Sequence, residues 1–272
     1  MKRAKSEKLT HLPPIRPVFK QLVPEPVARD VTRVSTDVGD LWLPASDRVM
    51  LPYFQNTGVW EPGEAKLLRS LLQPRSRFLD VGANVGYFSA LAAQSSPQGT
   101  IDAVEPEPLN VALLRMNLWT LAPHARLWPL CLGNSRGVVA LRLDENNSGN
   151  TVAEYSDQAK ALAAMVRGDE LFAGQTFDVV KIDVQGFEQQ VMEGLATVLR
   201  QSVDVRVVVE FFPVAVTERG GDPAEVLRSY RSLGFERCVA LNGRLCRLED
   251  TEILDLCERS GPTGFVNLLL RH

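Results

Sequence analysis

Short apolar runs alternate along this chain with longer segments in which apolar residues recur every three or four positions. The runs at 78–81, 101–104 and 177–182 are too short for helices, and their nearly continuous apolar character is typical of buried parallel strands. The first two runs are followed by helical patterns, at 87–92 and 108–116. Because strands that alternate with helices build βαβ units, this pattern predicts an α/β fold with a mostly parallel sheet.

Turn formers and capping residues mark further elements. Pro62 suits the first position of a helix, Ser156 and Asp222 suit N-caps, and Asn242-Gly243 predicts a hairpin that sets Val239 opposite Cys246. The other expected strands are 126–132, 138–143, 206–212, 235–241 and 265–270, and the other expected helices are 62–72, 156–165, 188–199, 222–233 and 251–259. Alternation between 31 and 51 predicts short strands or a hairpin.

Composition divides the chain into three parts. The segment 1–30 is basic and contains several prolines, so we expect a solvated arm; an arm that guides an acidic substrate or carrier protein is the alternative. The segment 31–72 should pack its strands and helix on the core, and 73–272 should form the main domain. With 45% hydrophobic residues, a chain of 272 residues can bury one large core.

Charge and cysteine spacing narrow the class of protein. The net charge of −3 gives no reason to expect nucleic acid or an anionic membrane as partner. No apolar run reaches the length of a membrane span and no signal peptide is evident, so we expect a cytoplasmic protein. The four cysteines lack C-x-x-C spacing and are expected to be reduced packing residues. The sequence does not indicate an oligomeric state.

The clearest candidate for a ligand site is the loop that follows the strand at 78–81. Asp80 closes the strand, and Gly82 and Gly86 would let the backbone turn sharply and bring bare N–H groups against a ligand at a helix N-terminus. A dinucleotide fingerprint requires G-x-G-x-x-G, whereas this loop has three residues between its two glycines. The loop therefore favours a cofactor without a pyrophosphate.

A second acidic residue points to a ribose. Glu105 ends the next strand, about 20 residues beyond the glycine loop, where an acid accepts hydrogen bonds from ribose hydroxyls. A ribose without a pyrophosphate indicates a nucleoside, and S-adenosylmethionine is the commonest cofactor of that kind. Tight turns in an ordinary α/β domain are the alternative explanation of the loop.

Charged residues also mark the carboxyl ends of two later strands. Asp183 ends the strand at 177–183, Lys181 lies two residues earlier, and Glu188 opens the following helix. Glu210 stands inside an apolar strand, where an acid is rare unless it is paired or functional. Because ligands of open α/β sheets bind outside the carboxyl ends of strands, we expect Asp183 beside the reacting group. A structural ion pair is the alternative role for Lys181, with Asp183 or Glu188 as its partner.

Several motifs together resemble the FkbM-type methyltransferases. They are D-V-G-A-N-V-G-Y-F-S from Asp80, V-E-P-E-P from Val104, N-S-G-N at 147–150, K-I-D-V-Q-G-F-E at 181–188 and V-E-F-F-P at 209–213. The resemblance implies a class I, Rossmann-like methyltransferase fold: a seven-stranded, mostly parallel sheet with an antiparallel edge strand and helices on both faces. It also implies S-adenosylmethionine as cofactor and O-methylation of sugars or other hydroxylated natural products. Gly168 departs from the family, which more often has Leu there.

The loop, the strand ends and the resemblance give a set of expected site residues. Those expected at the cofactor are Asp80, Gly82, Ala83, Asn84, Gly86, Tyr87, Glu105, Pro106, Leu132 and Asp183. Those expected at the substrate rim are Trp60, Glu61, Asn147, Ser148, Asn150 and Lys181. For Trp60 and Glu61 a packed helix cap is the alternative, since capping chemistry needs no ligand.

Methyl transfer to a hydroxyl requires alignment of oxygen, methyl and sulfur and removal of the alcohol proton. The candidates for the base are Asp183 first, then Glu210 and Glu188. A magnesium ion shared by Asp183 and Glu210 is the less favoured alternative, so no metal is expected. The rival functions are an NAD-dependent oxidoreductase, disfavoured by the missing glycine, and a catalytically silent cofactor-binding scaffold.

Overall fold

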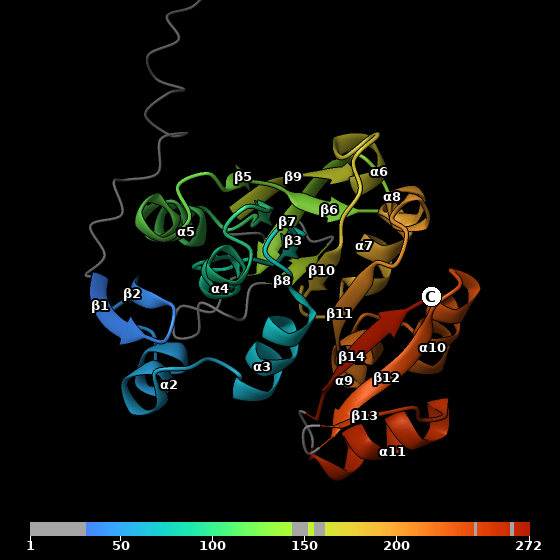
Figure 1. Cartoon of the computed structure of the whole chain (residues 1–272). Helices are drawn as coiled ribbons and strands as arrows, with labels where there is room; N and C mark the ends of the chain where they lie inside the picture. The colour runs from blue at the N-terminus through green and yellow to red at the C-terminus, as the bar shows by residue number, and fades with distance from the viewer. Residues whose placement is uncertain (1–30, 143–151, 155–160, 242–243, 262–263) are drawn as a thin grey trace, which may run out of the picture. The chain divides into compact units, whose positions relative to one another are not determined.

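A computed structural model describes residues 31–142, 152–154, 161–241, 244–261 and 264–272 of the chain (Figure 1). Within these residues, the largest sheet has eight strands in the order β13-β12-β14-β11-β10-β3-β4-β5. Its strands are β3 (Arg77–Val81), β4 (Thr100–Val104), β5 (Arg126–Trp128), β10 (Val179–Ile182), β11 (Arg206–Phe211), β12 (Glu236–Leu241), β13 (Arg244–Cys246) and β14 (Val266–Arg271). The predicted α/β class I methyltransferase fold is thus confirmed, with eight strands in place of seven.

The direction of the strands follows the prediction except at one end of the sheet. The strands β5, β4, β3, β10 and β11 pair in parallel, whereas β14 pairs antiparallel with β11 and with β12. The antiparallel strand therefore lies inside the sheet, and the prediction that it forms the edge was wrong. The hairpin of β12 and β13 extends the sheet beyond it, with Val239 opposite Cys246 as predicted.

Alternate residues of the central strands face two separate hydrophobic clusters. Val180 and Val207 belong to one cluster, while Val179 and Val208, one residue away, belong to the other. Successive side chains of a strand point to opposite faces, so both faces of the sheet are covered. The first face packs against α7 (Glu188–Gly194), α8 (Ala196–Gln201), α9 (Pro213–Glu218), α10 (Pro223–Ser232) and α11 (Asp250–Arg259). The second packs against α2 (Met50–Thr57), α3 (Pro62–Leu71), α4 (Tyr87–Ser95) and α5 (Pro108–Leu121).

A second sheet of four strands, in the order β6-β9-β7-β8, corrects two predictions. Its strands are β6 (Cys131–Gly133), β7 (Gly137–Arg142), β8 (Val152–Glu154) and β9 (Ala161–Arg167), and the short helix α6 (Gly168–Leu171) follows. The single strand expected at 126–132 is divided between the two sheets. The helix expected at 156–165 was wrong, because β9 pairs with β6 and β7 over the second half of that range. Pairing with β6 and β7 outweighs the intrinsic helical preference of this alanine-rich segment.

The expected N-terminal hairpin is confirmed as β1 (Val31–Thr36) and β2 (Gly39–Pro44), and Val31–His272 form one compact unit. Asn117 of α5 joins this hairpin to the loop between β3 and α4. Its Oδ1 accepts a hydrogen bond from the Trp42 amide at 2.7 Å, and its Nδ2 donates to the carbonyls of Trp42 and Val85 at 3.1 and 2.7 Å. One buried side chain thus joins three backbone groups of two segments. Among the described residues no helix is long and apolar enough to cross a membrane.

The first prediction concerns this contact. Asn117→Leu keeps the size of the side chain but removes the partner of the buried Val85 carbonyl and of two part-buried backbone groups of Trp42, so it should lower the free energy of unfolding by about 2–4 kcal/mol. Urea denaturation measures this loss. Thr120→Ala, at an exposed position of the same helix, is the control and should change stability by less than about 0.5 kcal/mol. An equally small effect of Asn117→Leu would show that the hairpin is held by other contacts.

Candidate active site

The glycine loop connects β3 to α4 and touches the end of β10. Gly82 has a φ of 84°, and a Cβ at this position would lie 1.9 Å from the Asp183 carbonyl oxygen. Gly86 has a φ of 95° and is the N-cap of α4. Both positions therefore require glycine, the first because two backbones meet there and the second because the chain turns in the left-handed region.

Four amides of this loop are engaged inside the protein, in contrast to the prediction that they are bare. The amides of Gly82 and Ala83 both donate to the Val104 carbonyl at 3.0 Å, and the Asn84 amide donates to Glu105 Oε2 at 2.9 Å. The Gly86 amide donates to the Ala83 carbonyl at 2.9 Å. The loop thus fixes the end of β4 and its acid, and these amides do not form a phosphate cradle.

Glu105 is held at the end of β4 by backbone donors on both oxygens. Its Oε1 accepts from the Glu107 amide and its Oε2 from the Asn84 amide, each at 2.9 Å. The side chain is 4% exposed, and burial raises the pKa of this carboxyl to about 7, although the backbone donors act in the opposite direction. Each carboxylate oxygen keeps a second lone pair, so the group can still accept hydrogen bonds from a ligand.

A cavity opens beside the loop, at the carboxyl ends of β3, β4 and β10. Predicted site residues that line it are Trp60, Glu61, Gly82, Ala83, Asn84, Tyr87, Glu105, Pro106, Leu132, Lys181, Asp183 and Glu210. Most of the predicted site is therefore assembled in one place from distant parts of the sequence. The rim residues Asn147, Ser148 and Asn150 lie outside the described residues.

Three predicted site residues are absent from the described lining. Gly86 acts through the turn, as above. Asp80 is fully buried and accepts a hydrogen bond from Ser89 Oγ at 2.6 Å, which fastens the first turn of α4. Glu188 Oε1 accepts from the amides of Val184 and Gly186 at 3.1 and 3.0 Å. In this position Glu188 supports the backbone between β10 and α7, and burial raises its pKa to about 7.

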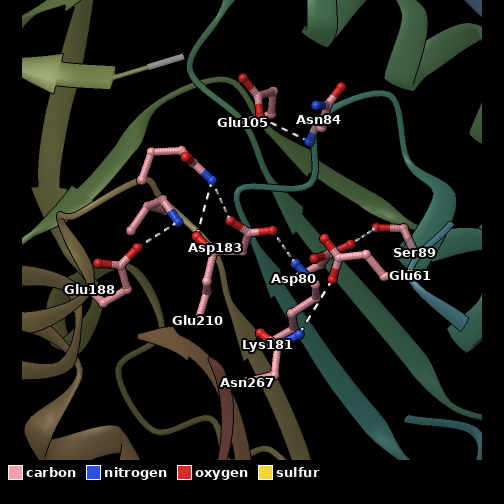
Figure 2. A network of polar contacts seen from close by, with 12 residues as sticks. Glu61, Asp80, Asn84, Ser89, Glu105, Lys181, Asp183, Glu188, Glu210 and Asn267 are labelled. Carbon is pink, nitrogen blue, oxygen red and sulfur yellow. Dashed lines mark hydrogen bonds and ion pairs between the residues drawn. The ribbon is translucent and has the colours of Figure 1, made fainter. Parts of the chain in front are cut away.

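Lys181 is the centre of an acidic cluster (Figure 2). Its side chain is 1% exposed, and its Nζ lies 2.9 Å from Asp183 Oδ2 and 4.6 Å from the centre of the Phe88 ring. Burial alone would lower the pKa of Lys181, but the neighbouring carboxylates, Asp183 foremost, outweigh burial and raise it. The ion pair with Asp183, which was the alternative role for Lys181, is therefore present. Both residues also line the cavity, as expected for the site.

Glu64, in the first turn of α3, belongs to this cluster and was missed by the sequence analysis. It is 6% exposed, and burial raises the pKa of its carboxyl well above the usual range, while the charge of Lys181 opposes that shift. Its neighbour Glu61 is the N-cap residue of α3, as the capping alternative expected, but it has a φ of 41° and its side chain makes no capping hydrogen bond. Glu61 instead accepts from Asn267 Nδ2 of β14 at 3.4 Å.

Gln185 is the second residue that the sequence analysis missed. Its Nε2 donates to Asp183 Oδ1 at 3.0 Å and to Glu210 Oε2 at 3.1 Å. Glu210 is 7% exposed, and burial, followed by the nearby charge of Asp183, raises its pKa well above the usual range. Within the described part of the chain, no group of three or more His, Cys, Asp or Glu side chains could hold a metal ion.

The arrangement fits a nucleoside cofactor without a pyrophosphate. Gly82 brings the cavity floor against the Asp183 backbone, where any Cβ would collide. Glu105 presents a carboxylate to the cavity, and Pro106, Leu130 and Leu132 give it an apolar wall beside that acid. A ribose acceptor next to a surface for a base is the donor set that such a cofactor requires.

Comparison with known proteins gives the family. A model described as the methyltransferase FkbM domain matches residues 80–237. No curated protein sequence matches the chain closely enough to add to that result.

Solved structures resemble the chain only distantly. A methyltransferase FkbM from Methylobacillus flagellatus is 11% identical, with a TM-score of 0.49 over 74% of this chain, which spans 44% of the length of that protein. An S-adenosylmethionine-dependent O-methyltransferase from Thermotoga maritima is 13% identical, with a TM-score of 0.46 over 88% of this chain and 77% of its own. An rRNA methylase from Streptococcus thermophilus is 10% identical, with a TM-score of 0.43 over 76% of this chain and 93% of its own.

These structural likenesses are too weak to carry an argument, and the assignment depends on the family model. That model covers more than half of the chain and includes the glycine loop, Glu105, Asp183 and Glu210. The protein therefore belongs to the FkbM family of methyltransferases and uses S-adenosylmethionine as its cofactor.

Proposed function

We propose that the protein transfers the methyl group of S-adenosylmethionine to a hydroxyl of a small metabolite, a sugar or another hydroxylated natural product in secondary metabolism. The observation that carries this proposal is the pair of cavity carboxylates, Asp183 and Glu210, beside the glycine loop. An alcohol must lose its proton as it is methylated, and a positioned carboxylate is a suitable acceptor.

Residues of this chain would hold the cofactor in a defined orientation. Glu105 would accept the ribose hydroxyls, and Leu132 and Pro106 would lie along the adenine. When bound, the cofactor supplies a methyl group on a sulfonium, which leaves without acid assistance. The protein's task is then to align the acceptor oxygen and remove its proton.

Asp183 is the first candidate for the proton acceptor. The Lys181 ammonium lies 2.9 Å from the Asp183 carboxylate, which faces the cavity with 22% of its side chain exposed. Glu210 is the second candidate, because its raised pKa makes it a stronger base once it is ionised. Glu188 is no longer favoured, since its Oε1 supports the loop backbone.

The chemistry of the cavity supports a neutral, hydroxylated acceptor. Glu61, Asp183 and Glu210 offer hydrogen-bond acceptors to hydroxyl groups, and Trp60 offers an aromatic face. The methyltransferase family argues against the NAD-dependent oxidoreductase considered from the sequence. Two other functions remain to be tested: a scaffold without enzymatic activity, and a methyltransferase that acts on nucleic acid. One assay tests both, by measuring methyl transfer to a panel of sugars, polyols, phenols and RNA. Transfer only to RNA, or to none of these acceptors, would overturn the proposal.

The second prediction tests cofactor recognition. Glu105→Ala removes the carboxylate expected to accept both ribose hydroxyls, so it should weaken S-adenosylmethionine binding by roughly 2–3 kcal/mol. Isothermal titration with S-adenosylmethionine, S-adenosylhomocysteine and NAD measures this, and NAD should not bind the wild-type protein. Glu170→Ala removes an exposed carboxylate paired with Arg136 and serves as the control. Unchanged affinity in Glu105→Ala would remove Glu105 from the cofactor site.

The third prediction tests the proton acceptor. Asp183→Asn should reduce turnover by about 10²–10⁴-fold while cofactor affinity stays nearly intact, because the amide keeps the shape of the side chain but cannot take a proton. Steady-state kinetics with an identified acceptor, run with and without excess EDTA, measures both points. Wild-type turnover in Asp183→Asn would transfer the role to Glu210, and loss of wild-type activity in EDTA would favour the metal mechanism.

A further inference from the structure

Gln185 bridges the two carboxylates from a single atom. Its Nε2 lies 3.0 Å from Asp183 Oδ1 and 3.1 Å from Glu210 Oε2. A side-chain amide nitrogen carries two hydrogens, so it can donate to both oxygens at once. Asp183 thus accepts from Gln185 on one oxygen and from Lys181 on the other.

The backbone that presents this amide is held in an unusual conformation. Gln185 has a φ of 54°, in the left-handed region where residues other than glycine are uncommon. The amides on either side of it, from Val184 and Gly186, donate to Glu188 Oε1, and its own carbonyl accepts from Arg219 Nη2 at 3.3 Å. Surrounding contacts therefore fix a conformation that costs free energy, a pattern typical of functional positions.

From this geometry we propose that Gln185 is a positioning residue, whose side-chain amide holds Asp183 and Glu210 together and, by donating to Glu210, favours its ionised form. The proposal rests on the proposed function, because it assigns these two carboxylates to the removal of the acceptor proton. Gln185 acts through them and is not itself the base. The amide nitrogen occupies the position between the carboxylates that a shared cation would otherwise take.

Electrostatics explains why such a bridge is needed. Two carboxylates close together disfavour the ionised form of each other, and burial adds to that effect at Glu210. The charged groups that face this pair are Glu61 and Glu64 near the start of α3, Asp80 of β3, Lys181 of β10 and Glu188 of α7. Of these only Lys181 is positive, and it contacts Asp183. The Gln185 amide is the donor that reaches Glu210 as well.

Three variants of Gln185 distinguish the loss of its hydrogen bonds to Asp183 and Glu210 from a loss of packing and from a change in backbone strain. Gln185→Glu keeps the size and polarity of the side chain but replaces its two donors with a carboxylate, and Gln185→Leu removes the donors without adding charge. Gln185→Gly also removes them and relieves the positive φ, so it should remain folded if the others do not. Gln189→Leu is the matched control, because the Gln189 amide donates to Glu193, one turn further along α7, and Gln189 is not among the described residues that line the cavity.

The fourth prediction uses two readouts. Loss of the bridge should raise the pKa of Glu210 further, so the acidic limb of the kcat/KM profile should move up by about one pH unit. On the acidic limb itself this means up to about a tenfold loss of kcat/KM, which shrinks as the pH rises. A packing defect would instead lower kcat/KM by a similar factor at every pH. The control variant should keep the wild-type profile.

The second readout needs neither cofactor nor substrate. In protein labelled with ¹³C at glutamate carboxyls, the signal that disappears in Glu210→Gln reports the titration of Glu210. Its midpoint should rise by about one pH unit in Gln185→Leu and Gln185→Gly relative to wild type and to Gln189→Leu. An unchanged midpoint in these folded variants would overturn the role of Gln185. If no acceptor is methylated by the wild-type protein, the proposed function fails while this titration still decides the proposal for Gln185.

Discussion

A single buried ammonium group, that of Lys181, stabilises the acidic side chains that gather at the cavity of this protein. Lys181 lies in the middle of the sheet with 1% of its side chain exposed, and Asp183, Glu64, Asp80 and Glu61 all raise its pKa. Each of these carboxylates would be costly to bury alone, and one cation serves them together. The parallel strands β3 and β10 set Asp80 directly opposite Lys181. The register of the sheet therefore places the cation, and the cation allows acids to gather where β3, β10 and β11 end.

The glycine loop binds the end of β4 and Glu105, the acid at that strand's end, and three of its amides are used for these contacts and not for a ligand. Its amides bind the Val104 carbonyl and the Glu105 carboxylate, and so hold that carboxylate at the cavity edge. A pyrophosphate would need those amides for itself. Their use inside the protein is consistent with a nucleoside cofactor, whose ribose requires an acceptor. Gly82 then serves a packing purpose, since the Asp183 backbone leaves no room for a Cβ.

The sequence was sufficient for the fold class and for most of the site because both depend on local patterns. Apolar runs mark the strands, and Gly82 marks the turn after one of them. The acids Glu105, Asp183 and Glu210 stand at strand ends or in a buried strand, where packing does not explain their side chains. The alanine-rich β9 was missed because its neighbours in the second sheet decide its conformation. Glu64 looked like an ordinary first-turn acid, and Gln185 like a loop residue. Their roles depend on contacts with other segments, Glu64 with Lys181 and Gln185 with Glu210.

The most direct test of this account is the pH dependence of stability in Lys181→Met. The raised pKa of Lys181 keeps it protonated from pH 5 to pH 8, so its own charge is constant over this range. Without it, Asp80 and Glu64, whose pKa values burial already raises, would ionise in the folded state only at greater cost. Protonation of these acids at low pH removes that cost. The loss of unfolding free energy relative to wild type should therefore be at least about 1 kcal/mol larger at pH 8 than at pH 5. An equal loss at both pH values would contradict the claim that Lys181 balances the cluster.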